Sequence, residues 1–297
     1  MARELERRHA GLAVELVPIV TRGDRYRGDL AEVGGKGLFT DELEAGLRDG
    51  SLDLAVHSLK DLPVTLGDGL AIAAFPERAD SRDVLVSEVA ESVDSLPEGG
   101  VVLTGSLRRR AQLLARRPDL EVRAIRGNVD TRVRVWRESG AAAVVLAAAG
   151  LARLGGRLAE LELPVHPLPP EEMLPAPGQG TLALEVAAGS PAEPLCAVLD
   201  HPPTARAAEA ERRVVAAFGG DCTLPLAAWA REDGDGGGLR LTGLLATPDG
   251  RRLARGEGVG GNPAAAAGAG IAAMREAGAD EVLAEIRRTR PGGGAPG

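Results

Sequence analysis

Aromatic residues are scarce in this chain: Phe, Trp and Tyr together make up 2% of the sequence. Leu, Val and Ala must therefore build the hydrophobic cores. Proteins that bind single-stranded nucleic acid commonly stack bases on aromatic side chains, so the scarcity argues against that class. The formal net charge of -8 also argues against a protein that binds polyanions over its whole surface.

Cysteine, histidine and long apolar segments are scarce as well. Two cysteines, Cys196 and Cys222, make no disulfide framework, which is typical of a reduced compartment. The four histidines lack the spacing of a metal-ligand set, so no metal site is expected. The longest apolar run, 141–152, is too short to cross a membrane, and the charged opening "MARELERRHAGL" lacks the apolar centre of a secretory signal. We therefore expect a cytoplasmic protein that binds neither membrane nor nucleic acid.

Short apolar segments alternate with amphipathic ones along the first two hundred residues. This pattern is typical of an α/β fold with parallel sheets. The amphipathic segment 38–50 predicts a helix closed by Gly50. Strands are predicted at 12–20, 52–58, 101–104, 121–125, 142–149 and 181–186.

Two irregular segments suggest that the chain crosses twice between two α/β lobes. Residues 75–83 join one unit to the next, and the segment 167–180 is rich in proline and glycine. A double crossing is the layout of a hinged protein with a cleft. After about residue 200, a predicted helix and three predicted strands indicate a small α+β domain. The predicted domains are an α/β domain of residues 1–76 and 181–199, a second α/β domain of residues 82–174, and an α+β domain of residues 203–290.

An arginine-rich segment, "SLRRRAQLLARRPDLEVRAIRGNVDTRVR", covers residues 106–134 and holds nine arginines against three acids. Ser106 and Asn128 are each predicted to cap a helix that follows a strand. Helix N-termini and the carboxyl ends of parallel strands favour anions, and paired guanidiniums suit carboxylates. We therefore expect several arginines to lie together at one edge of the sheet and to bind a ligand with several carboxylates. The arginines so placed are Arg108, Arg109, Arg126 and Arg132. The other arginines of the segment are interpreted as solvated surface charges.

The stretch "VHSLKDLPV" ends a predicted buried strand with three polar residues, Ser58, Lys60 and Asp61, in a loop. Two interpretations stay open for this stretch. It is either a solvated surface turn or a carboxylate aimed at the cleft, able to stabilise a cation or move a proton. His57 is interpreted as a packing or surface residue.

The stretch "AAFGGDCTLPL" places Cys222 in a glycine-rich turn between a predicted helix and a predicted strand. An accessible cysteine in such a turn suits a nucleophile or a covalent attachment point. Cys196 lies among apolar residues of a predicted helix and is interpreted as part of a core.

Ten motifs, in order from Val20 to Pro225, together resemble the porphobilinogen deaminase (hydroxymethylbilane synthase) family. They are "VTRGD", "VGGKGLF", "ELE", "AVHSLKDLP", "SLRR", "RRPDL", "IRGNVDTR", "LAAAGLARLG", "LPAPGQG" and "GGDCTLP". The resemblance implies two hinged α/β lobes like those of periplasmic binding proteins, plus a small C-terminal α+β domain. It also implies a monomeric transferase that joins four porphobilinogen molecules head to tail, releases ammonia, and adds water to give hydroxymethylbilane for tetrapyrrole synthesis.

The resemblance assigns roles to particular residues. Cys222 would hold a dipyrromethane cofactor through a thioether, and Asp61 would be the catalytic aspartate. Each pyrrole unit carries an acetate and a propionate, which would account for the concentration of arginine. The residues matched to carboxylate contacts are Ser58, Lys60, Thr104, Ser106, Arg108, Arg109, Arg126, Arg132 and Arg153.

Three departures from the family pattern bear on these expectations. The family's opening strand, with its Ala-Thr-Arg-x-Ser motif, is expected to be absent, because the chain begins inside what resembles the first helix. The cysteine loop is one residue longer than the common version, and Glu32 replaces a frequent lysine. The alternatives are a weakly active or inactive truncated relative, or a non-catalytic carboxylate-binding protein of the same fold. Cys222 and Asp61 discriminate, because a binding protein needs neither.

Overall fold

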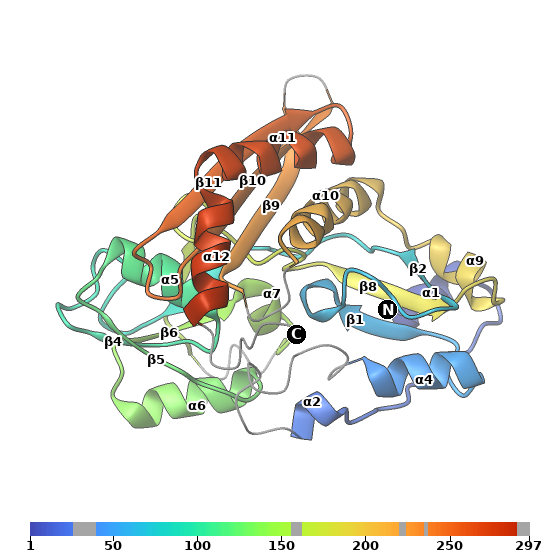
Figure 1. The fold of residues 1–297 in the computed structure, drawn as a ribbon. Helices are drawn as coiled ribbons and strands as arrows, with labels where there is room; N and C mark the ends of the chain where they lie inside the picture. The colour runs from blue at the N-terminus through green and yellow to red at the C-terminus, as the bar shows by residue number, and fades with distance from the viewer. Residues whose placement is uncertain (26–39, 156–161, 220–223, 235–236, 290–297) are drawn as a thin grey trace.

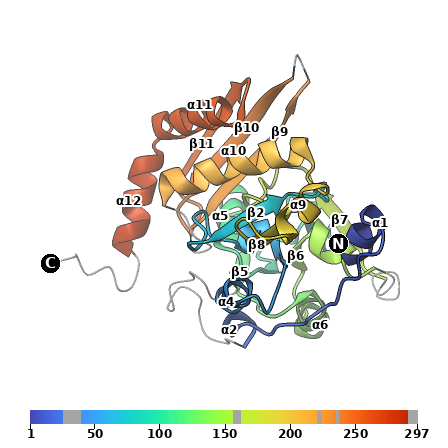
Figure 2. The ribbon, with the colours of Figure 1, turned by 90° about the vertical axis from the view of Figure 1, so that its right-hand side faces the viewer.

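The computed structural model describes residues 1–25, 40–155, 162–219, 224–234 and 237–289. Within these residues the strands form three separate sheets. Figure 1 shows two lobes side by side with a third domain above them, and Figure 2 shows the same arrangement turned by 90°.

The first lobe contains α1 (Ala2–Arg8), α4 (Asp41–Asp49), β1 (Ala55–Ser58), β2 (Leu70–Ala74), β8 (Leu182–Ala187) and α9 (Ala192–Ala197). Its sheet has the order β1-β8-β2, and both pairings are antiparallel. The prediction of parallel pairing is wrong here, because β8 returns from the other lobe and enters between the other two strands. One face of β8 packs through Leu184 on Leu5 and Cys196. The other face packs through Ala183 on Ala208.

The segment 12–20 was expected to be a strand and is not one. Its side chains alternate, but Leu16, Val17 and Val20 are exposed, and the segment pairs with no described strand. A strand needs a neighbour for its backbone hydrogen bonds, and alternation alone does not supply one. The predicted helix at 38–50 is confirmed as α4, which ends at Gly50 in the left-handed conformation.

The second lobe contains β3 (Asp83–Val86), β4 (Val101–Leu103), α5 (Leu107–Arg116), β5 (Glu121–Arg123), α6 (Val129–Ser139), β6 (Ala143–Ala147), α7 (Ala148–Ala152) and β7 (Val165–Leu168). Its sheet has the order β5-β4-β6-β3-β7. Strand β4 runs parallel to β5 and β6, as predicted, whereas β3 runs antiparallel to β6 and β7. The carboxyl ends of β4, β5 and β6 therefore meet at one edge, where ligands of α/β sheets commonly bind.

The third domain contains α10 (Pro202–Phe218), β9 (Leu226–Asp233), β10 (Gly238–Ala246), β11 (Leu253–Gly260), α11 (Pro263–Glu276) and α12 (Ala279–Thr289). Its antiparallel sheet has the order β11-β10-β9, and the α+β prediction is confirmed. Helix α11 packs unusually close to β11. A Cβ atom added at Gly258 would lie 2.2 Å from the backbone nitrogen of Gly270. Small residues thus let this aromatic-poor domain pack backbone against backbone.

Two segments, 75–82 and 175–181, connect the first lobe to the second. They touch each other directly: Ala79 N–H donates a hydrogen bond to the carbonyl oxygen of Gly180 over 3.1 Å. Gly180 has a φ of +87°, and a Cβ atom there would lie 2.5 Å from the carbonyl oxygen of Ala79. Only glycine allows this approach, so the two crossings run as one paired connection.

Glu211 of α10 ties this connection to the third domain. It is fully buried. Its carboxylate accepts hydrogen bonds from both guanidinium ends of Arg78 at 2.7 and 3.1 Å, from Gly178 N–H at 2.6 Å, and from Ala230 N–H at 2.8 Å. Both crossings and strand β9 therefore form hydrogen bonds with the same buried carboxylate.

Candidate functional site

The turn after β1 carries Lys60 and Asp61 toward the second lobe. Strand β1 runs directly into a one-turn helix, η1 (Leu59–Asp61). Leu59 is buried, and its N–H donates to the carbonyl oxygen of Thr181 over 3.0 Å. Because Leu59 is held inward, the next two side chains are left exposed. The turn is therefore fixed by its first residue and presents the two charged residues outward.

The ammonium of Lys60 lies among charges from both lobes. Crowding by the surrounding protein lowers its pKa, although part of the side chain remains accessible to solvent. The carboxylate of Asp61 opposes this shift, and the guanidinium of Arg109 adds to it. Lys60 and Asp61 of the first lobe thus stand within electrostatic reach of the arginines of the second.

Both predicted helix caps are confirmed at the facing edge of the second lobe. The Ser106 hydroxyl accepts a hydrogen bond from Arg109 N–H over 3.4 Å at the start of α5. The Asn128 side chain accepts one from Thr131 N–H over 2.9 Å at the start of α6. The caps place the helix N-termini, with their partial positive charge, where β4 and β5 end.

Arg132, in the first turn of α6, is half-buried. Its Nε donates to the carbonyl oxygen of Gly127 over 2.7 Å. Burial lowers the pKa of Arg132, as do the charges of Arg109 and Arg126, while the charge of Asp61 opposes them. Three guanidiniums therefore lie within electrostatic reach of one another here, a setting that suits an anionic ligand.

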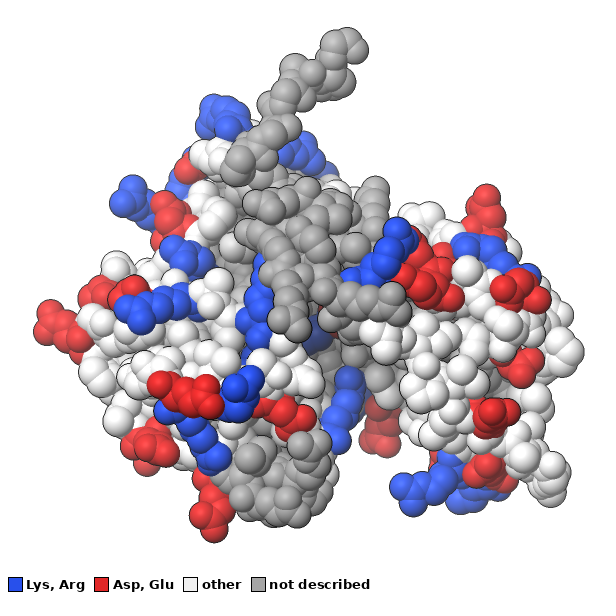
Figure 3. Space-filling view, turned by 90° about the horizontal axis from the view of Figure 1, so that it is seen from below, with Lys and Arg blue, Asp and Glu red and all other residues white. Residues whose placement is uncertain are grey.

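Arg153 makes a direct contact between the lobes at the end of α7. Its Nη1 donates to the hydroxyl of Ser58 over 3.1 Å. A small pocket of about 30 Å³ lies at this contact. Figure 3 shows Lys and Arg side chains along the boundary between the lobes. The residues lining the pocket are Ser58, Lys60, Ala147, Ala149, Gly150, Arg153, Gly178, Gln179, Gly180 and Thr181.

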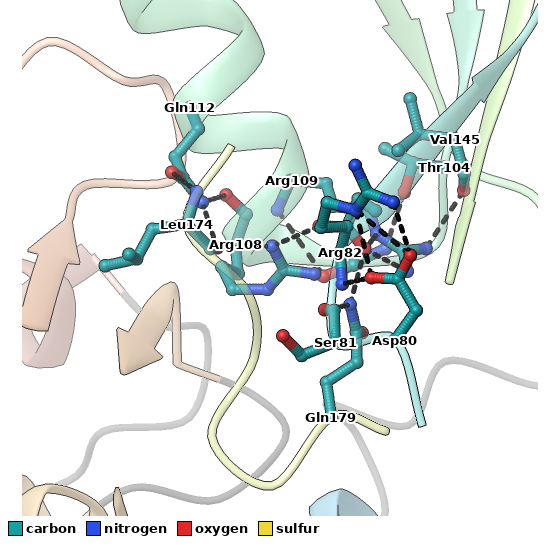
Figure 4. A network of polar contacts seen from close by, with 12 residues as sticks. Asp80, Ser81, Arg82, Thr104, Arg108, Arg109, Gln112, Val145, Leu174 and Gln179 are labelled. Carbon is teal, nitrogen blue, oxygen red and sulfur yellow. Dashed lines mark hydrogen bonds and ion pairs between the residues drawn. The ribbon is translucent and has the colours of Figure 1, made fainter. Parts of the chain in front are cut away.

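Arg108 and Arg109 are buried and hold a partner within the chain (Figure 4). Asp83, which has no exposed surface, lies 2.7 Å from Nη1 of Arg108 and 2.8 Å from Nη2 of Arg109. Burial alone would raise the pKa of Asp83, but the two guanidinium charges hold it well below its usual range. Arg108 also donates to the carbonyl oxygen of Leu174, and Arg109 to that of Val145. Neither arginine is a solvated surface charge.

Two members of this cluster, Asp83 and Gln179, were missed at the level of sequence. The Gln179 amide, from the second crossing, donates to Asp83 and to the Ser81 carbonyl oxygen, both over 2.8 Å. Thr104 is also buried, and its hydroxyl accepts from Ser106 N–H over 3.2 Å. The only sequence signal was the charge of "SRD" at the start of a buried strand, and this charge says nothing about the distant partners of Asp83.

Cys222 and the "VGGKGLF" motif lie outside the described residues. Among the residues that are described, no cluster of histidine, cysteine and carboxylate side chains could hold a metal ion. The same part of the chain has no helix long and apolar enough to cross a membrane.

Two α/β lobes are joined by a double crossing, and Lys and Arg side chains lie along the boundary between them. Solved structures that resemble the chain include a periplasmic VFT2 domain of Bordetella pertussis BvgS. It is 19% identical, with a TM-score of 0.39 over 66% of this chain and 72% of that one.

Comparison with known families is more specific. The model of the porphobilinogen deaminase dipyromethane cofactor binding domain matches residues 1–192, and that of the C-terminal domain matches residues 205–277. A porphobilinogen deaminase of Rubrobacter xylanophilus is 46% identical over 286 residues, which is 96% of this chain and 92% of the relative. One of Bordetella parapertussis is 46% identical over 294 residues, covering 97% and 91%. The chain belongs to the porphobilinogen deaminase family, a family of transferases.

Proposed function

We propose that this protein is a hydroxymethylbilane synthase that joins four porphobilinogen molecules head to tail and then adds water to the linear product. The observation that supports this most is the exposed carboxylate of Asp61, which lies beside Lys60 and within electrostatic reach of Arg132. Such a site can hold the acidic side chains of pyrroles while placing one negative charge near the reacting centre.

The described residues fit the dipyrromethane cofactor of the family. A dipyrromethane carries four carboxylates, and the guanidiniums of Arg109, Arg126 and Arg132 lie within electrostatic reach of one another. The buried Nε of Arg108 also has no hydrogen-bond partner among the described residues. Residues proposed to hold the cofactor are Ser58, Lys60, Thr104, Ser106, Arg108, Arg109, Arg126, Arg132 and Arg153, with Cys222 as its thioether attachment. When bound, the cofactor supplies the free pyrrole carbon to which the first substrate is joined.

Asp61 is proposed as the catalytic residue. Porphobilinogen loses its amino group when the carbon–nitrogen bond breaks and the nitrogen leaves, with a proton, as ammonia. The remaining substrate is a methylene-pyrrolenine cation, which then forms a carbon–carbon bond while the attacked pyrrole carbon loses its proton. A carboxylate facing this cation stabilises the transition state. Removing one preorganised group of this kind costs about 2.7–4 kcal/mol, or roughly 10²–10³-fold in rate.

The test is Asp61→Asn, which preserves shape and removes charge. Consumption of porphobilinogen and release of ammonia should fall by about 10²–10³-fold, with no change in the melting temperature. Asp53→Asn is the matched control, because Asp53 is an exposed acid shortly before β1. Near-normal turnover by Asp61→Asn would remove this residue from the mechanism. Binding of porphobilinogen by the unaltered protein without any ammonia release would indicate a binding protein instead.

We also propose that the protein acts as a cytoplasmic monomer. The residues that line the pocket between the lobes come from both lobes of the same chain. Light scattering on the purified protein tests this point, and a mass of twice 30.6 kDa at assay concentration would overturn it.

A further inference from the structure

A carboxylate and an imidazole lie buried behind the turn that carries Lys60 and Asp61. His57 is the residue of β1 just before its end, and Glu185 lies within β8. His57 Nε2 is 2.8 Å from Glu185 Oε2. Glu185 has no exposed surface, and His57 is 6% exposed. His57 is therefore a packed residue, as the sequence suggested, but its neighbour is a carboxylate.

The surroundings of this pair are apolar. The register sets His57 opposite Ala183, so Glu185 lies two residues along β8 on the same face. Ala183 packs on that face with Leu62 and Ala208 in a buried cluster. A carboxylate in such a place is costly unless it is paired. Among the described residues neither Glu185 oxygen has a hydrogen-bond partner, so the 2.8 Å approach of His57 Nε2 is its closest polar contact. Packing alone therefore does not explain why a carboxylate occupies this buried position.

Arg212 of α10 contacts the backbone on the far side of the turn. Burial lowers the pKa of Arg212, and the charge of Glu185 opposes that shift, so the two groups lie within electrostatic reach. Arg212 Nη2 donates to the carbonyl oxygens of Pro63 and Val64 over 3.0 and 2.6 Å. These residues follow Asp61 closely. Arg212 thus holds the backbone that leaves the turn, and Glu185 lies on β8, which pairs with the strand that enters it.

We propose that His57, Glu185 and Arg212 are positioning residues that fix both ends of the Lys60–Asp61 turn. They do not touch the reacting atoms. The turn is exposed and is reused for every porphobilinogen added, so its carboxylate must return to the same place each time. A misplacement of about 1 Å can cost about 10²-fold in rate. The inference rests on the proposed catalytic role of Asp61.

The experiment compares Glu185→Gln, His57→Gln and the double variant. Each single variant should lower kcat by about 10–100-fold and leave KM unchanged, because most cations proposed to bind substrate belong to the second lobe. The double variant should be no slower than the slower single variant, since residues acting as a unit are not additive. Leu184→Ala is the control for stability: it lies beside Glu185 on the opposite face of β8. It should lower the melting temperature without changing kcat at 25 °C.

Arg212→Gln keeps the test possible if the buried variants fail to fold. It should lower kcat in the same way and speed amide hydrogen exchange in a peptide covering residues 59–66. Normal kcat with unchanged exchange would overturn the proposal, as would multiplied effects in the double variant or an equal loss of kcat in Leu184→Ala. Asp61→Asn is measured in parallel. If that variant turns over normally, the proposed function of Asp61 fails, and the exchange result alone decides whether the network holds the turn.

Discussion

Replacing Asp83 with asparagine removes one negative charge from the interior of the second lobe and leaves two guanidiniums beside it. In the native protein its carboxylate accepts from Arg108, twice from Arg109, and once from Gln179, at 2.7 to 3.0 Å. Removing one partner of a buried ion pair typically costs about 3–5 kcal/mol, because the remaining charge stays buried without compensation. We therefore expect the melting temperature of Asp83→Asn to fall by roughly 10 °C.

Asp80→Asn is the matched control, since Asp80 lies three residues earlier and pairs with Arg82 on the surface. An exposed pair contributes less than about 1 kcal/mol. Thermal denaturation followed by circular dichroism should therefore separate the two variants clearly. Equal shifts for both would refute the argument that burial gives the Asp83 cluster its stabilising effect.

The contribution of Asp83 to the free energy of unfolding should also depend on pH, and only acidification should diminish it. Its pKa in the folded protein is lower than in the unfolded chain, so its contribution is fully present above the unfolded value of about 4. The contribution is lost as the pH falls toward the folded pKa. The stability difference between the native protein and Asp83→Asn should be constant from neutral pH to about pH 5 and shrink in stronger acid. A difference that grows on acidification would contradict the assignment.

Two further predictions concern the ligand. Cys222→Ser should lack the mass of two pyrrole units and fail to react with an aldehyde reagent for free pyrrole positions; an unaltered protein with the mass of the bare polypeptide would refute the attachment. Arg132→Leu should stall elongation and leave the melting temperature nearly unchanged, because Arg132 is half-buried and its Nε donates to a carbonyl oxygen, that of Gly127, rather than to a carboxylate. Native gels should show enzyme-bound pyrrole chains that are shorter than in the unaltered protein. Normal product formation by Arg132→Leu would count against this role of Arg132.

Structural features that depend on a few neighbouring residues could be predicted from the sequence. Ser106 and Asn128 cap their helices as predicted, because a cap depends on residues within one turn. The turn at Lys60 and Asp61 could likewise be located from the end of the apolar strand before it. The close packing of Leu59 under that turn explains why the two charges stay outside.

Features that depend on distant partners could not be predicted. Arg109 meets Asp83 across 26 positions, and Gln179 reaches the same aspartate across 96. A run of arginines gives no sign that two of them face inward. The antiparallel direction of β8 could not be predicted from the sequence either, because it is set by where the chain re-enters the first lobe. For the same reason alternation in 12–20 predicted a strand that has no described neighbour.

The three-way bonding of Glu211 has a mechanical consequence. One carboxylate pins Arg78 of the first crossing, Gly178 of the second and Ala230 of β9, so the three segments share a pivot. A lobe that swings about the crossings must either break these bonds or carry α10 and β9 with it. Those two elements are the ones that precede and follow Cys222 in the chain. Any opening of the lobes about the crossings would therefore also move α10 and β9, the two elements on either side of the segment that contains Cys222.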